Sequence, residues 1–245
     1  LPAGTVIARE QTYVHTFHKE DAPKQAFAGS EDDDRQVVFS GPHFKATFDK
    51  QSGLLVSYRY KKQEYIHNGQ GPRPFFWRAP TDNDYGAKLP VRLKAWKEAS
   101  YQEPKAESFN VVRDKDTTAV KVTYRFPQTD ARWDITYKIY GNGVIKVDNH
   151  FVAENAQTPM IPRVGLRMQL PARITSLTYY GRGPEENYRD RRTSQFIGEY
   201  TSGIQDMYEP YVRPQENNHA RTSIGAPSPA KQKKVCCLLP TALSK

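Results

Sequence analysis

Three segments of the chain combine aromatic rings, carboxylates, arginines and amides on backbone that does not follow a strand pattern. They span residues 74–86, 179–191 and 206–217. Aromatic faces stack on the C–H faces of sugars, while planar carboxylate, amide and guanidinium groups hydrogen-bond to sugar hydroxyls. These residue types in these segments therefore predict carbohydrate chemistry.

Asp82, Asn83 and Asp84 stand together in the first segment and are followed by Gly86. One interpretation is an Asx-turn, in which the side chains cap backbone N–H groups and have no further role. A calcium site also uses such oxygens, but the spacing of a full calcium loop is missing. A contact to substrate is the third interpretation, and the residue types alone leave it open beside the Asx-turn.

The adjacent Glu185 and Glu186 resemble a pair of catalytic acids, but neighbouring residues of an extended chain point to opposite sides. We therefore expect a structural role for them, paired with Arg189 or Arg191. The Glu-Asn pair at residues 216–217 is also expected to be structural, with a sugar contact as the alternative.

The six histidines and two cysteines show no spacing typical of metal ligands. His15 and His18 are three residues apart, but a strand or linker would direct them apart. Cys236 and Cys237 are adjacent, whereas disulfide frameworks and zinc sites need spaced ligands. We expect no metal site and no cofactor in this chain, and its cysteines leave the redox compartment open.

The elements that must position the three segments are β-strands. Apolar and polar residues alternate over several stretches separated by turn signals: 44–48, 54–58, 120–126, 133–139, 144–151 and 164–170, with hairpin turns at 49–53 and 141–143. One short helix is indicated by Leu89, Leu93 and Trp96, which lie at i, i+4 and i+7. Strands without a βαβ rhythm predict an all-β antiparallel sandwich, with all three tryptophans in its core.

Composition excludes several other classes of protein. Among the 245 residues, 37% are hydrophobic and 12% aromatic, which is too apolar for a disordered chain. No run approaches about 18 apolar residues, so no membrane partner is expected. Of the net charge of +9, five charges lie in residues 221–245, which contain no acid. Because the rest of the chain is close to an ordinary charge balance, no nucleic-acid partner is expected either.

The three segments together resemble the C-terminal small-chain domain of family-2 β-galactosidases. The motifs that carry the resemblance read WRAPTDND over residues 77–84, GPEENYRDR over 183–191, and DMY, PYV and QEN over 206–208, 210–212 and 215–217. The resemblance covers residues 37–219, and residues 1–11 are similar to the last strand of the immunoglobulin-like domain that precedes the small chain in that family.

This resemblance implies a large antiparallel β-supersandwich of the galactose mutarotase type. Residues 1–30 would be the end of the preceding immunoglobulin-like domain with a linker, so the chain is expected to start within a longer protein. Residues 31–220 would be an incomplete supersandwich, and residues 221–245 an aberrant basic tail. The compartment, cytoplasmic or periplasmic in a bacterial-type cell, is left open.

The resemblance also implies a function. A retaining glycosidase needs two carboxyl groups about 5–5.5 Å apart, and in this family both glutamates lie on a TIM barrel outside the small chain. This chain would then be a non-catalytic part of an enzyme that hydrolyses terminal β-D-galactosides, and inactive alone. Asp82, Asn83 and Asp84 would lie on a mobile loop at the wall of the substrate pocket, with Gly86 as its hinge.

The implied partners are the galactoside, the barrel, the immunoglobulin-like domain and further copies in a homo-oligomer. Any Mg²⁺ or Na⁺ of the enzyme would lie outside this chain. Two other classes stay open. A stand-alone carbohydrate-binding sandwich predicts that the isolated chain binds sugar. A mutarotase-like enzyme needs a histidine, His43 or His150, to meet a carboxylate on a concave sheet face as general acid and base.

The sequence departs from the family pattern after residue 217. The family continues through an Asp-x-x-Trp stretch into further strands, whereas residues 221–231 are basic, rich in proline and without alternation. Codon degeneracy permits an overlapping reading frame, starting within the Arg221 codon, that reads Asp-Ile-Asp-Trp and is similar to the family's continuation. Our hypothesis is that residues from about 221 onward are the product of a frameshift, and the alternative is a natural basic tail.

Sequencing the gene again across the codons for residues 220–223 tests this hypothesis. We expect a one-base change of register at that point, because family pattern and strand periodicity are lost together there. An unbroken register would leave the natural basic tail as the explanation.

Overall fold

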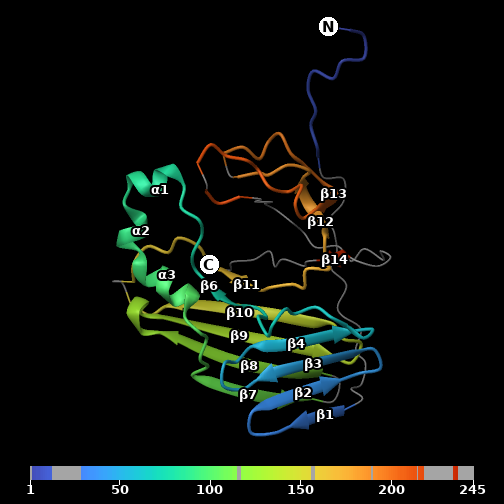
Figure 1. Ribbon diagram of the computed structural model, residues 1–245, viewed down its shortest axis with the longest axis vertical. Coiled ribbons are helices and arrows are strands. Elements are labelled where there is room, and N and C mark those ends of the chain that lie inside the picture. The colour runs from blue at the N-terminus through green and yellow to red at the C-terminus, as the bar shows by residue number, and fades with distance from the viewer. Residues whose placement is uncertain are drawn as a thin grey trace. The chain divides into compact units, whose positions relative to one another are not determined.

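The computed structural model describes residues 2–12, 29–114, 117–155, 158–188, 190–213 and 215–217, with the backbone of residues 234–236 (Figure 1). The chain divides into two compact units. Residues 21–171 form the sandwich unit, and residues 1–20 with 172–245 form the terminal unit. The predicted domain boundaries at residues 30 and 220 stay predictions.

The sandwich unit contains two large antiparallel sheets (Figure 1). The first has the order β1-β2-β3-β4-β5, with β1 at Gly29–Asp32, β2 at Gln36–Ser40, β3 at Phe44–Asp49, β4 at Leu55–Tyr60 and β5 at Gln63–Glu64. The second has the order β10-β9-β8-β7, with β7 at Ser108–Arg113, β8 at Thr117–Phe126, β9 at Ala131–Tyr140 and β10 at Ile145–Ala153. Both predicted hairpins, β3–β4 and β9–β10, are confirmed.

Short elements complete this unit. Strands β6 (Arg73–Phe75) and β11 (Gly165–Arg167) form a two-stranded antiparallel sheet. The helices are α1 (Asp82–Gly86), α2 (Leu89–Arg92) and α3 (Lys94–Tyr101), with a 3₁₀ turn at Pro127–Thr129. In the terminal unit, β12 (Ser176–Gly183) pairs antiparallel with β13 (Phe196–Gly203) and parallel with β14 (Lys234–Cys236). The predicted all-β antiparallel class is confirmed.

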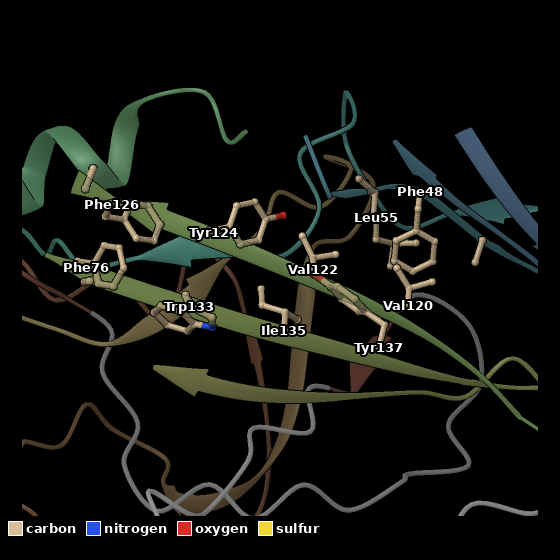
Figure 2. Packing of buried hydrophobic residues seen from close by; sticks show 14 of the residues in the cluster. Phe48, Leu55, Phe76, Val120, Val122, Tyr124, Phe126, Trp133, Ile135 and Tyr137 are labelled. Atoms are coloured by element: carbon tan, nitrogen blue, oxygen red, sulfur yellow. The ribbon is translucent and has the colours of Figure 1, made fainter. Parts of the chain in front are cut away.

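The core of the sandwich unit lies between its two sheets. Every second residue of β9 from Ala131 to Ile139 is buried, as period-2 alternation requires. Figure 2 shows Tyr137 of β9 and Phe48 of β3 in this core, and their ring centroids are 5.2 Å apart at an interplanar angle of 65°. Such edge-to-face packing of aromatic rings stabilises beyond the area that it buries.

Phe76 is the centre of an aromatic cluster at one end of this core. Its side chain is fully buried, and its ring contacts those of Trp96, Trp133, Phe126 and Phe151 at centroid distances of 4.8, 5.3, 4.9 and 5.7 Å. The three tryptophans of the chain are at most 6% exposed, which confirms their predicted place in the core. Since Phe76 follows β6 directly, the core fixes the start of the first motif.

Four local predictions for the sandwich unit differ from the structure. The single predicted helix is split into α2 and α3, because Leu93 leaves helical geometry at φ −111° and ψ 24°. A third helix, α1, stands where a loop was expected. Residues 29 and 30, predicted as the end of a linker, belong to strand β1, which pairs with β2. The predicted strand over residues 164–170 is reduced to Gly165–Arg167.

The predicted terminal strand is absent from residues 2–12, and Tyr13 lies outside the described part. A strand requires a neighbouring strand as its hydrogen-bond partner, whereas here the Gln11 side chain makes the hydrogen bonds to the neighbouring backbone. The amide of Gln11 donates to the carbonyl oxygen of Ile197 at 2.7 Å and accepts from its N–H at 2.7 Å. Within the described part of the chain, no helix is long and apolar enough to cross a lipid bilayer.

The carboxylate of Glu64 accepts hydrogen bonds from strand β4 and from the two residues that follow β5. Its Oε1 accepts from the backbone N–H groups of Tyr58, Tyr65 and Ile66 at 2.9, 3.0 and 2.9 Å. Its Oε2 accepts from the Ser57 hydroxyl at 2.5 Å. Burial raises the pKa of Glu64, but these hydrogen bonds to the charged form outweigh it, and the net pKa lies below the usual 4.5.

We predict that Glu64→Gln destabilises the fold by about 1–3 kcal/mol at pH 7, the range for hydrogen bonds to a charged group. A lowered folded-state pKa contributes stability that is present above pH 4.5 and is lost as the pH falls through the folded-state pKa. The deficit of the variant should therefore shrink as the pH falls through the folded-state pKa of Glu64, below which both side chains are neutral. Urea unfolding at pH 7 and pH 3 measures both effects.

The matched control is Glu98→Gln, because Glu98 is half-exposed on α3 and pairs only with Lys94 one turn away. Its effect should stay within about 0.5 kcal/mol at both pH values. Equal costs for the two variants at pH 7 would contradict the role of Glu64.

Candidate functional site

The first motif begins in the core of the sandwich unit. Trp77 is 6% exposed, and the N–H of Phe76 donates to the hydroxyl of Ser100 on α3 at 2.9 Å. That hydroxyl donates in turn to the carbonyl oxygen of Trp96 at 2.7 Å. Helix α3 therefore holds the start of the segment that leads to α1.

A capping box starts helix α1. The N–H of Asp84 donates to the Thr81 hydroxyl at 3.4 Å, and the N–H of Thr81 donates to Oδ2 of Asp84 at 2.9 Å. The two bonds satisfy two backbone N–H groups at the helix start. The other carboxylate oxygen of Asp84 accepts from Arg78 at 2.8 Å, and Asp84 is only 8% exposed. The carboxylate of Asp84 thus caps a backbone N–H as the first interpretation expected, but in a capping box at a helix start and not in an Asx-turn.

The remaining predicted site residues lie on the outer side of the same short helix. Asp82 and Asn83 are exposed in its first turn, and the ring of Tyr85 is 57% exposed. A Cβ added to Gly86 would meet nothing within 4 Å, and its backbone is outside the left-handed region. Neither space nor conformation therefore demands glycine there, and its role as a hinge stays a prediction.

The structure also identifies residues that the sequence interpretation did not single out. Arg78 and Thr81 fix the carboxylate of Asp84, and Tyr85 adds an exposed ring beside the polar pair. The Thr-x-x-Asp spacing of a capping box was a signal for the helix start. No sequence signal identified Arg78 as its ion-pair partner.

The second and third motifs meet in the terminal unit. Nη2 of Arg191 donates to Oε1 of Glu186 at 2.7 Å and to the Tyr211 hydroxyl at 2.5 Å, and that hydroxyl also donates to Glu186. The guanidinium of Arg191 lies 4.7 Å from the ring centroid of Tyr188. The predicted pairing of the glutamates with arginine is confirmed for Glu186 and Arg191, while Arg189 lies outside the described residues.

A largely buried ion pair holds this cluster together. The side chain of Glu186 is 7% exposed and its charge faces Arg191 directly. Burial raises the pKa of the Tyr211 hydroxyl, and so does the hydrogen bond to Glu186. The hydroxyl is therefore held as a donor, and the cluster ties residues 206–217 to the 183–191 motif.

Side-chain amides of the same unit also hold loop backbone in place. Asn217 accepts from the N–H of Glu209 at 2.8 Å and donates to its carbonyl oxygen. The fully buried Asn187 donates to the carbonyl oxygen of Glu185 at 3.2 Å, while Gln195 accepts from the Glu185 N–H at 3.2 Å. These contacts agree with the structural role expected for residues 185 and 217.

Other candidate chemistry is not assembled in the described residues. Nδ1 of His150 lies 3.7 Å from the carboxylate of Asp134, but the histidine side chain is 73% exposed on an open sheet surface, and His43 is also exposed. In the described part of the chain, no three His, Cys, Asp or Glu side chains converge as metal ligands. A cavity of about 190 Å³ lies beside β8 and residues 102–105, and none of the predicted site residues lines it.

The first motif lies in the antiparallel sandwich unit, and the second and third lie in the terminal unit with its antiparallel β12–β13 pair. All-β antiparallel architecture and these three motifs define the class of protein. The family model described as "Beta galactosidase small chain" matches residues 40–224. The chain therefore belongs to the β-galactosidase small-chain family.

Individual relatives agree with the family assignment. A β-galactosidase of Priestia megaterium is 34% identical over 216 residues, which cover 87% of this chain and 20% of that protein. β-Galactosidases of Streptococcus thermophilus and Clostridium acetobutylicum are 32% and 36% identical, over 90% and 81% of this chain. The chain spans about a fifth of the length of these curated relatives.

We predict that Asp84→Ala opens α1 without unfolding the sandwich. The variant loses the side-chain cap and the partner of Arg78, so the local free energy of opening should fall by about 1–3 kcal/mol. Hydrogen exchange of the amides of residues 84–87 measures this as an acceleration of about 5- to 150-fold. Asn83→Ala is the matched control and should change exchange by less than threefold, because the Asn83 side chain is exposed in the same turn; equal acceleration in both variants would contradict the assignment.

Proposed function

We propose that this chain is the non-catalytic small-chain part of a retaining, family-2 β-galactosidase. The parent enzyme would hydrolyse terminal β-D-galactosides through a covalent glycosyl-enzyme intermediate, with both catalytic carboxyl groups on a TIM barrel outside these residues. The observation that carries the proposal is the family match over residues 40–224 in a chain that covers a fifth of each β-galactosidase it resembles.

We infer that helix α1 presents the substrate-facing groups. Asp84 is committed to Arg78 and to the helix cap, so it holds the turn in place. Asp82 and Asn83 are exposed on that turn, where a carboxylate and an amide are suited to accept from and donate to sugar hydroxyls. Gly86, at the end of the helix, is the proposed point about which the loop closes over the sugar.

The remaining parts of the proposal concern what surrounds the chain. The barrel and an upstream immunoglobulin-like domain are its intramolecular partners, and the galactoside meets it only in their company. Any Mg²⁺ or Na⁺ is bound by those other parts, and the assembled enzyme forms a homo-oligomer. Nucleic acids and membranes are not proposed as partners. The fragment alone is inactive, since it contributes a wall and no carboxyl pair.

Activity on a chromogenic β-galactoside tests the proposal. It should be measured for this chain alone and for a longer polypeptide that includes the barrel. We expect turnover only from the longer polypeptide. Turnover by the 245-residue chain itself would overturn the non-catalytic assignment, and sugar binding without turnover would favour the stand-alone binding module.

Variants of the longer enzyme test the individual residues. Asp82→Ala with Asn83→Ala should raise KM about tenfold, the loss expected for about 1.4 kcal/mol of hydrogen bonding to substrate. Lys97→Ala is the matched control, because Lys97 is exposed on α3, away from the turn. A KM unchanged by the double substitution would remove α1 from the substrate pocket.

A further inference from the structure

The cavity beside β8 combines apolar and charged residues in its lining. It lies in the sandwich unit, where the end of α3 and residues 102–105 meet β6 and β8. Four of the residues that line it are apolar: Pro74, Ala99, Pro104 and Phe126. Its volume of about 190 Å³ exceeds the roughly 150 Å³ of a protein cavity that holds benzene. The cavity therefore has room for a ring or a short aliphatic chain.

Arg73 of β6 brings a positive charge to the lining of this cavity, and its side chain is 9% exposed. Nη1 of Arg73 donates to the side-chain oxygen of Gln70 at 3.2 Å, and Nη2 donates to the carbonyl oxygen of Ser100 at 3.4 Å. Both acceptors are neutral. Among the described residues its only ion pair is with Glu103, which is 3.9 Å away and has a side chain 85% exposed. Since buried charges are normally closely paired, the charge of Arg73 is only partly balanced.

Other cations add to this positive charge. Lys105 lines the cavity and is exposed, and it forms no ion pair within the described part of the chain. Arg167 lies directly opposite Arg73 in the β6–β11 pair, and residues opposite each other share a face of the sheet. Arg125 also lines the cavity, but its guanidinium already pairs with two carboxylates at 2.7 and 2.5 Å. The charge at the cavity is therefore complementary to an anion.

We propose that this cavity binds a small organic carboxylate. The carboxylate group of the ligand accepts hydrogen bonds from Arg73 and Lys105. Its apolar body packs against Ala99 and Phe126. A guanidinium has five N–H donors in a planar fork that matches a carboxylate, and two of those of Arg73 donate in the hydrogen bonds to Gln70 and Ser100. Inorganic phosphate fits less well, because it has no apolar part to place against the apolar lining.

Benzoate is the probe, with the intact 245-residue chain as the receptor and titration calorimetry as the measurement. Benzamide has nearly the same shape without the charge, and inorganic phosphate has the charge without the apolar body. We expect benzoate to bind at least about tenfold more tightly than either, the factor for hydrogen bonds to a charged group. Equal affinity for benzoate and benzamide, or no benzoate binding at about 10 mM, would overturn the proposal. Tighter binding of phosphate would make the site one for inorganic anions and would also overturn it.

Substitutions of exposed residues test the charges without disturbing the core. Lys105→Gln should weaken benzoate binding about threefold, because it removes a favourable charge at the rim of the cavity. Glu103→Gln should strengthen binding about threefold, because it removes the carboxylate that competes for Arg73. Lys97→Gln is the matched control, since Lys97 is exposed on α3 and does not line the cavity. Equal weakening by the two lysine variants, or weaker binding by Glu103→Gln, would contradict the proposal.

Amide chemical shifts locate the bound benzoate independently of any substitution. The largest changes should fall on Ala99, on residues 102–105 and on Phe126, and largest changes elsewhere would overturn the assignment to this cavity. None of these measurements involves hydrolysis of a galactoside. The carboxylate site and the proposed function therefore stand or fall separately.

Discussion

The packing of Phe76 among four aromatic rings is the constraint on which the rest of the sandwich unit depends. That side chain joins the second sheet, through Trp133 and Phe126, to helix α3, through Trp96. It is also the residue at which β6 gives way to the first motif. Displacing this ring would therefore loosen the core and, in the same step, release the segment that ends in α1.

In each of the two units a buried carboxylate is paired with an arginine. Asp84 pairs with Arg78 and a helix cap, while Glu186 pairs with Arg191 and Tyr211. A buried carboxylate is tolerated only when its partners replace water. Arg78 and Asp84 belong to one motif, while Glu186 and Arg191 share another and Tyr211 comes from the third. Many of the motif residues therefore hold loops in place. The proposed contacts to substrate fall instead on exposed members of the first motif, Asp82 and Asn83.

Local sequence patterns predicted the strands well where one face is fully buried. The alternation in β8 and β9 and the turns of the β3–β4 and β9–β10 hairpins appear as expected, since period-2 burial leaves little choice of register. Prediction was weaker for short elements. Helix α1 depends on a capping box of two residues, and β1 on pairing with a strand that is itself already paired. Neither has enough periodicity to be recognised alone.

The sequence by itself determined the all-β class, the buried tryptophans and the family, because hydrophobic alternation and long motifs are carried by neighbouring residues. Tertiary structure alone decided which carboxylates are buried. Asp82 and Asp84 are two residues apart and of one type, yet one is exposed and the other 8% exposed. Their difference depends on where Arg78 and Thr81 lie in space. Tertiary packing likewise left Leu166 and Met168 uncovered, because burial depends on what lies opposite a strand as well as on its own pattern.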